Sequence, residues 1–277
     1  FAKEVNVGQN IDIASDGDVY NILLIGSDTR DGWYGNSDSM ILASINSQTK
    51  TIYMTSFMRD LYANIPNVGI RKLNSAYAIG GGPLLVSTIE SNYRVDIDNY
   101  ASVDFSSMAN IIDLVGGVDL EVSTQEAGYI NMYLDEQCRL QGLNASDYYV
   151  AGGGITHLNG NQAVGFARIR YTSRGNEHSD YGRTSRQREI LVQLMQKARS
   201  LDATTLLAVV NNMLPLITHN IDAATLTTLI ANAPSYINYD IQTDRIPYDG
   251  LYSNLGEELV PDFEATINRL HQTIYGN

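Results

Sequence analysis

The chain has 277 residues, of which 44% are hydrophobic and 18% are charged, and it contains no run of 18 uninterrupted apolar residues. This composition is typical of a globular domain and gives no transmembrane helix. The net charge of -13 argues against broad nucleic-acid binding, which requires a surplus of cations. The single cysteine, Cys138, excludes an internal disulfide. Because the sequence opens at Phe1 rather than at Met, we expect any anchor or signal to lie upstream.

The first half of the chain alternates between strand-like and helix-like segments. The run VYNILLIG predicts a strand that ends at Gly26, and MILASI and TIYMTSF predict a hairpin around NSQTK. Residues 80–94 predict a helix entered through glycines and Pro83, and strands are expected at NYASV and VDLEV with a helix between them. This alternation predicts an α/β fold with a mixed central sheet flanked by helices, an α-β-α sandwich.

The second half is less regular. Residues 124–153 are rich in Gly and Tyr and predict an insertion around a short helix, followed by helices at LNGNQAVGFARIR and from Asp180 onward. We therefore expect a lead-in over residues 1–18, a catalytic domain over 19–199, and a C-terminal helical extension, packed on the same domain, over 200–277.

A basic island interrupts this acidic chain. Residues 165–190 carry six arginines against three acidic residues, a local charge of +3 in a chain whose remainder sums to -16. The chain has 14 Arg but only 4 Lys, and the guanidinium fork matches phosphate oxygens in bidentate geometry. The island therefore predicts a small, highly anionic ligand, with a general preference for surface arginine as the alternative.

The helix near Asp180 carries a stripe that changes character along its length. Arg183, Gln187, Ile190 and Leu194 share one face, polar toward the helix start and apolar toward its end. This pattern indicates that a core wall ends at an anion-binding cavity near the helix N-terminus. The alternative is a surface ion pair between Arg183 and Asp180.

Two further groups are candidate ligands. Arg168 and Arg170 would point the same way if the preceding helix ends before Arg168, and they could then clamp an anion. Asp28 and Asp38 flank a loop between two strands, where hard oxygen ligands could hold Mg²⁺, although loop aspartates more often cap or turn the backbone.

Seven ordered segments resemble the motifs of the LytR-CpsA-Psr family. They are NILLIGSDTR, SDSMILASIN, SFMRD, RKLNSAYAIGGG, DLVGGVDLEV, LNGNQAVGFARIR and DYGRTSRQREIL, and together they span roughly residues 19–199. One departure is that Phe57 and Met58 stand where the family usually reads Ile-Pro, which restores a donor N–H before Arg59.

The resemblance implies a hydrophobic pocket for a polyprenyl chain, and we expect residues 84–89 and 108–115 to line part of it. It implies Mg²⁺, with Mn²⁺ as the alternative ion, at Asp28 and Asp38. The residues implied to bind pyrophosphate are Arg59, Arg168, Arg170, Arg183 and Gln187, to which we add Arg30 and Lys72. Asp60 and Asp180 are the candidates for the general base, and the sequence does not choose between them.

The implied activity is transfer of a glycopolymer, of the teichoic acid or capsule type, from a polyprenyl-pyrophosphate carrier to peptidoglycan. The implied location is the outer face of a Gram-positive cell membrane, reached through an N-terminal anchor. The alternatives are a polyprenyl-phosphate-binding protein and a pyrophosphate hydrolase that does not transfer the polymer.

Overall fold

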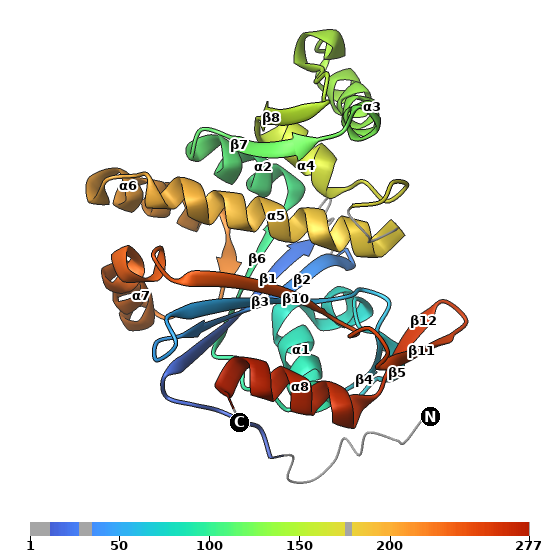
Figure 1. Ribbon diagram of the computed structural model, residues 1–277, viewed down its shortest axis with the longest axis vertical. Helices are drawn as coiled ribbons and strands as arrows, with labels where there is room; N and C mark the ends of the chain where they lie inside the picture. Colours follow the sequence, from blue (N-terminus) through green and yellow to red (C-terminus); the bar gives the residue numbers. More distant parts are fainter. Residues whose placement is uncertain (1–11, 28–34, 175–178, 277) are drawn as a thin grey trace. The chain divides into compact units, whose positions relative to one another are not determined.

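The structure is a computed structural model that describes residues 12–27, 35–174 and 179–276. The chain forms two compact units, each treated separately below. The sheet unit combines Phe1–Asp104 with Thr218–Asn277, and the inserted unit is Phe105–Ile217. Figure 1 shows the elements of both units coloured along the sequence.

The sheet unit is built on a six-stranded mixed sheet in the order β10-β3-β2-β1-β6-β9. Its strands are β1 (Val19–Ser27), β2 (Ser37–Asn46), β3 (Thr51–Phe57), β6 (Asn99–Asp104), β9 (Thr218–His219) and β10 (Asp240–Ile246). Strands β1, β3, β6 and β10 run in one direction, whereas β2 and β9 run in the other. The carboxyl ends of four strands and the start of β2 therefore meet at one edge of the sheet.

The sequence pattern explains the first three strands. Buried and half-buried residues alternate along β1, as expected for a strand with one face on the core. The β2–β3 hairpin is confirmed, with Asn46 opposite Thr51 at its turn. Two small antiparallel pairs complete the unit: β4 (Tyr62–Ile65) with β5 (Gly69–Lys72), and β11 (Tyr252–Leu255) with β12 (Glu258–Pro261).

The described residues of the sheet unit form the helices α1 (Ser75–Tyr93), α7 (Ala223–Tyr236) and α8 (Phe263–Tyr275). Helices α1 and α8 contact each other and strand β2, and both lie below the sheet in Figure 1. Helix α1 is interrupted by non-helical backbone at Gly80 and Gly81. A short helical stretch begins at Ser75 and ends at this interruption. The helix start predicted at the glycines and Pro83 is the start of the second segment of α1.

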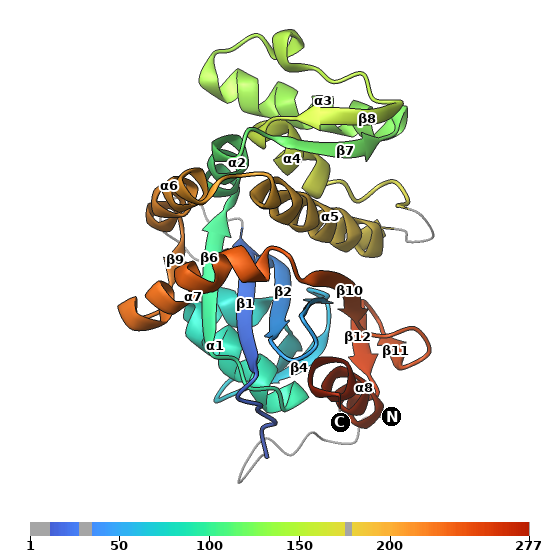
Figure 2. The same ribbon diagram turned by 60° about the vertical axis from the view of Figure 1, so that its left-hand side comes forward.

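The inserted unit consists mainly of helices, with one antiparallel pair of strands. Its elements are α2 (Phe105–Leu114), β7 (Val118–Val122), α3 (Thr124–Gln141), the 3-10 helix η1 (Ala145–Tyr148), β8 (Gly154–Leu158), α4 (Gly160–Ala167), α5 (Ser179–Arg199), α6 (Ala203–Met213) and the 3-10 helix η2 (Leu214–Leu216). Its core joins buried residues of β7, α3, α4 and α5, among them Leu120, Ile130, Phe166 and Ile190. Figure 2 shows the β7–β8 pair beside α3 and α4.

Residues 200–277 differ from the helical extension that the sequence predicted. They contain α6, α7 and α8 but also four strands, and β9 and β10 form the two edges of the central sheet. The division expected at residue 199 therefore does not coincide with the compact units. The sequence analysis missed these strands because they are short and carry many polar residues, as β10 does. The apolar helical stretches in the same segment gave the stronger pattern.

The expected helix within residues 124–153 is longer than predicted, because α3 has 18 residues. The α/β fold class with a mixed central sheet is confirmed. Leu85 and Ile89 are buried in the sheet unit and Ile112 is buried in the inserted unit, while an enclosed lipid pocket stays a prediction.

Helix α4 approaches α2 so closely that only glycine fits at its first position. A Cβ atom at Gly160 would lie 2.0 Å from the carbonyl oxygen of Ala109. The Gly160 N–H also donates to Asp113 at 2.7 Å, which fixes the start of the helix. The sequence LNGN thus sets the position of α4, whose last residue immediately precedes Arg168.

We expect Gly160→Ala to lower the free energy of unfolding by about 1–3 kcal/mol, because the added methyl group would force α4 away from α2. Gly128→Ala is the matched control, since Gly128 is exposed on α3 and an added Cβ would meet nothing within 4 Å. It should stabilise the protein by about 0.5–1 kcal/mol. Urea unfolding of both variants checks this, and equal shifts would contradict the steric argument.

Candidate functional site

Asp38 occupies an irregular position at the edge where the four strands end. Gly26 of β1 pairs with Ser39 and Ser27 pairs with Ser37, so Asp38 is the extra residue of a β-bulge. Bulges commonly redirect a side chain next to a functional site. The bulge therefore places a half-buried carboxylate at this edge of the sheet.

A chain of ion pairs runs from Asp38 along this edge. The guanidinium of Arg59 lies 3.5 Å from Asp38 and 3.2 Å from Asp60, and the ammonium of Lys72 lies 2.9 Å from Asp60. The hydrogen bond that Lys72 donates to Asp60, with a further one that it donates to Glu257, raises the pKa of Lys72 and keeps the side chain charged. Four of the predicted site residues in the sheet unit are thus brought together.

Met58, the residue before Arg59, extends the pairing of two strands. The N–H of Met58 donates to the carbonyl of Ile246 at 3.0 Å and continues the pairing of β3 with β10. A proline at this position would lack that donor. Two other predicted residues, Asp28 and Arg30, lie outside the described residues.

In the inserted unit, α4 ends at Ala167 and delivers two arginines with different partners. The guanidinium of Arg168 lies over the rings of Phe105 and Tyr133, at 4.6 Å and 5.0 Å from their centroids. Such cation-π contacts hold a guanidinium in place without neutralising its charge. The helix ends at Ala167, which meets the condition set for an arginine clamp, although the segment predicted as helical extended to Arg170. Arg168 keeps helical backbone angles, so the two arginines do not follow an extended strand.

Asp180 joins Arg170 to Arg183 at the start of α5. The Asp180 carboxylate lies 3.7 Å from Nε of Arg170 and 3.1 Å from Nη2 of Arg183. The expected ion pair between Arg183 and Asp180 exists, but it is not at the surface, because Arg183 is only 3% exposed. The three residues carry a net positive charge at the N-terminus of a long helix, which also favours an anion.

The rest of the predicted stripe follows the same helix face. Ile190 belongs to the core of the inserted unit and Leu194 packs against it, while Gln187 is half-buried between them and Arg183. The structure thus supports the prediction that this face turns from apolar to polar toward the helix start.

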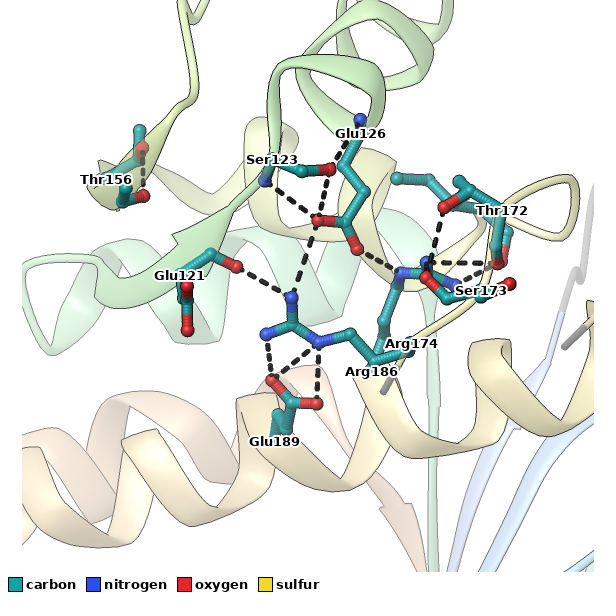
Figure 3. A network of polar contacts seen from close by, with 11 residues as sticks. Glu121, Ser123, Glu126, Thr156, Thr172, Ser173, Arg174, Arg186 and Glu189 are labelled. Carbon is teal, nitrogen blue, oxygen red and sulfur yellow. Dashed lines mark hydrogen bonds and ion pairs between the residues drawn. The ribbon is translucent and has the colours of Figure 1, made fainter. Parts of the chain in front are cut away.

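Two arginines of the basic island serve the fold instead. Arg186 is fully buried and donates from Nε to Glu126 at 2.9 Å, and Arg174 binds Glu189 through two nitrogens and approaches Glu126 at 3.4 Å (Figure 3). Glu126 also closes a capping box at the start of α3, accepting from the N–H and hydroxyl of Ser123. These contacts form a buried ion-pair network that we call the Glu126 network (Glu126, Arg174, Arg186 and Glu189).

The Glu126 carboxyl is ionised despite its burial. Burial alone would raise the pKa of Glu126, but the Ser123 donors, Arg186 and Arg174 outweigh it, so its pKa lies below the ordinary value. The sequence analysis did not predict this network, although local spacing marks two of its members. Ser123 and Glu126 have capping-box spacing, and Arg186 lies one turn before the core residue Ile190.

Neither a metal cluster nor a membrane span is found in the parts of the chain that the structure describes. No three His, Cys, Asp or Glu side chains there are arranged to hold a metal ion. No described helix is both long and apolar enough to cross a bilayer.

Comparison with known proteins agrees with the fold and the motifs. The chain matches the LytR_cpsA_psr family over residues 2–269, and it therefore belongs to the LytR-CpsA-Psr family. A relative from Oceanobacillus iheyensis, named polyisoprenyl-teichoic acid--peptidoglycan teichoic acid transferase TagU, is 34% identical over 287 residues. The match covers 99% of this chain and 79% of that relative. Other relatives, from Streptococcus mutans, Bacillus licheniformis and Enterococcus faecalis, are matched over 50%, 55% and 60% of their own length.

Solved structures share the fold over nearly the whole chain. A Streptococcus agalactiae protein superposes with a TM-score of 0.74 at 25% identity, covering 93% of this chain and 88% of its own. The family protein YwtF (TagT), solved with bound octaprenyl pyrophosphate, superposes with a TM-score of 0.66 at 21% identity, covering 94% and 92%.

We expect Glu126→Gln to lower the free energy of unfolding at neutral pH by about 3–5 kcal/mol, because Arg186 would stay buried without its counter-charge. The depressed pKa of Glu126 adds stability above its unfolded value of about 4.5, and this stability is lost as the pH falls through the folded value. The variant should therefore lose less stability than the wild type on acidification. Chemical unfolding between pH 7 and pH 3 checks this, and parallel pH profiles would contradict it.

Proposed function

We propose that this chain is the catalytic part of a phosphotransferase that moves a glycopolymer from a polyprenyl-pyrophosphate carrier to peptidoglycan. The observation that carries the proposal is the Asp180-linked pair of Arg170 and Arg183, with Arg168 nearby in sequence at the end of α4. The name of the Oceanobacillus iheyensis relative and the pyrophosphate lipid bound to YwtF (TagT) support the same substrate class.

The arginines suit a reaction at a pyrophosphate. A sugar hydroxyl of peptidoglycan attacks the phosphorus that bears the polymer, and the bond to the bridging oxygen breaks to release polyprenyl monophosphate. Negative charge grows on the bridging and non-bridging oxygens as this occurs, so fixed guanidinium groups stabilise the transition state more than the ground state. Arg168 is held by two aromatic rings and Arg183 is buried, so little reorganisation is needed when the anion arrives.

Asp60 and Asp180 are the two candidates for the general base. Each already lies beside two cations, Arg59 and Lys72 for Asp60 and Arg170 and Arg183 for Asp180. The two candidates are distinguished by measuring the rate of transfer against pH for Asp60→Asn and for Asp180→Asn. Only the variant that lacks the general base should lose the fall in rate at low pH.

A divalent ion, Mg²⁺ with Mn²⁺ as the alternative, fits Asp38 as one ligand. The carboxylate is half-buried at the sheet edge and supplies the hard oxygen that Mg²⁺ prefers, with Asp28 as the proposed second ligand. Phosphate oxygens and water would complete the coordination. Bound there, the ion would neutralise charge on the pyrophosphate. We also propose that the protein acts outside the cell membrane, held by an anchor that precedes this sequence.

The decisive experiment incubates the protein with a lipid-linked teichoic acid and peptidoglycan. Polymer attached to peptidoglycan supports the transferase. Free polymer released without attachment indicates a hydrolase, and binding without turnover indicates a lipid-phosphate carrier; either result contradicts the proposal.

We expect Arg170→Ala to slow transfer by about two orders of magnitude, because one charge-assisted contact to the transition state, about 3 kcal/mol, is lost. The unfolding midpoint should stay near that of the wild type, since the Arg170 side chain is 36% exposed. Arg139→Ala, at an exposed position on α3, is the control and should change neither quantity. A lowered midpoint with normal specific activity would make Arg170 a structural residue.

We expect transfer to stop when EDTA removes divalent ions and to return with Mg²⁺. Asp38→Asn should raise the Mg²⁺ concentration needed for half-maximal rate by about tenfold or more, because a neutral amide is a weaker ligand for a hard cation. Asp249→Asn, which removes an 85% exposed carboxylate from its ion pair with Arg245, should leave that concentration unchanged. An unchanged Mg²⁺ dependence in Asp38→Asn would refute the assignment.

A further inference from the structure

The fully buried side chain of Arg186 binds backbone as well as Glu126. Its Nη1 donates to the carbonyl of Ile169, and its Nη2 donates to the carbonyls of Thr172 and Ser173, each at 3.2 Å. Residues 169–173 belong to no helix or strand, so their carbonyls lack the partners that regular structure provides. Arg186 satisfies three of them with one rigid group (Figure 3).

These three carbonyls flank Arg170. Ile169 precedes it and Thr172 follows two residues later, so the bonds to Arg186 fix the backbone on both sides. Arg186 also lies one turn after Arg183 on α5, while Asp180 on that helix contacts both Arg170 and Arg183. One guanidinium therefore sets the position of the loop that carries Arg170 relative to the helix that carries Arg183.

We propose that Arg186 is a positioning residue for pyrophosphate binding: it holds the segment 169–173 so that Arg170 and Arg183 present their charges at a fixed separation. This inference rests on the proposed function. Stability alone is a weak reason for such a pair, because buried ion pairs are often replaced by apolar residues without loss of stability. An apolar residue at position 186 could not bind the three carbonyls.

Arg174 offers a matched comparison within the same network. In the described part of the chain its hydrogen-bond and ion-pair partners are Glu121, Glu126 and Glu189, and it binds none of the carbonyls of residues 169–173. Changing either arginine to lysine keeps the charge beside Glu126 but removes the planar fork. Only Arg186→Lys releases the segment that carries Arg170.

The test compares Arg186→Lys with Arg174→Lys well below their unfolding midpoints. The affinity for geranylgeranyl pyrophosphate, a short prenyl pyrophosphate, is measured by calorimetry, and amide hydrogen exchange is measured over residues 169–173. We expect Arg186→Lys to weaken binding at least tenfold and to speed exchange in that segment. Arg174→Lys should change binding less than threefold and leave exchange unchanged. Equal effects in the two variants, or normal affinity in Arg186→Lys, would overturn the proposal.

Two other results, a variant that does not fold and a wild type that does not bind, also have a defined meaning. If Arg186→Lys does not fold, Glu126→Gln is measured in its place, because this variant loosens Arg186 while keeping an oxygen acceptor at position 126. Weaker binding and faster exchange in Glu126→Gln than in Arg174→Lys would support the proposal. Equal binding and equal exchange in the two variants would oppose it. If the wild type does not bind the prenyl pyrophosphate, the proposed function fails. Hydrogen exchange alone then decides whether Arg186 holds the segment.

Discussion

The carboxylate of Glu126, which has almost no access to solvent, holds together three parts of the inserted unit. It closes the first turn of α3 through Ser123, accepts a hydrogen bond from Arg186 on α5, and lies beside Arg174 near the end of the segment after α4. Burying such a charge is costly, and the cost is offset only because every neighbour donates to it. Removing any one of these donors leaves part of the buried charge without compensation. The geometry of α3, α5 and the segment that ends at Arg174 thus depends on one ion.

Five of the six arginines of the basic island divide into two classes by their partners. Arg174 and Arg186 face carboxylates and are neutralised within the fold, so they add little to the field outside it. Arg168 is held by aromatic rings, and Arg170 and Arg183 both lie beside the carboxylate of Asp180, so these three guanidinium groups are held in place. A surplus of positive charge held in fixed positions is what a doubly charged phosphate ester requires. The local charge of this segment therefore overstates the charge available to a ligand.

The sequence predicted best those features that repeat along the chain. The apolar run VYNILLIG identified β1, the NSQTK turn identified the β2–β3 hairpin, and helical spacing identified the face of α5 that carries Arg183 and Ile190. It failed where the partner is distant in sequence. Nothing near Asp240 indicates that β10 pairs with β3, and nothing near Arg186 indicates that Glu126, sixty residues earlier, is its counter-ion. The β-bulge that redirects Asp38 likewise depends on the register between two strands, which local composition does not encode.

The two edge strands of the sheet come from a late part of the chain. Strands β3, β2, β1 and β6 are all available once residue 104 has been made, whereas β9 and β10 follow the whole inserted unit. Until residue 246 is available, β3 has no neighbour on its outer side, and a bare strand edge readily pairs with another chain. The nascent protein therefore passes through a long interval in which its sheet can recruit a strand from a neighbouring molecule. A chain truncated before β10 would leave the outer edge of β3 permanently exposed.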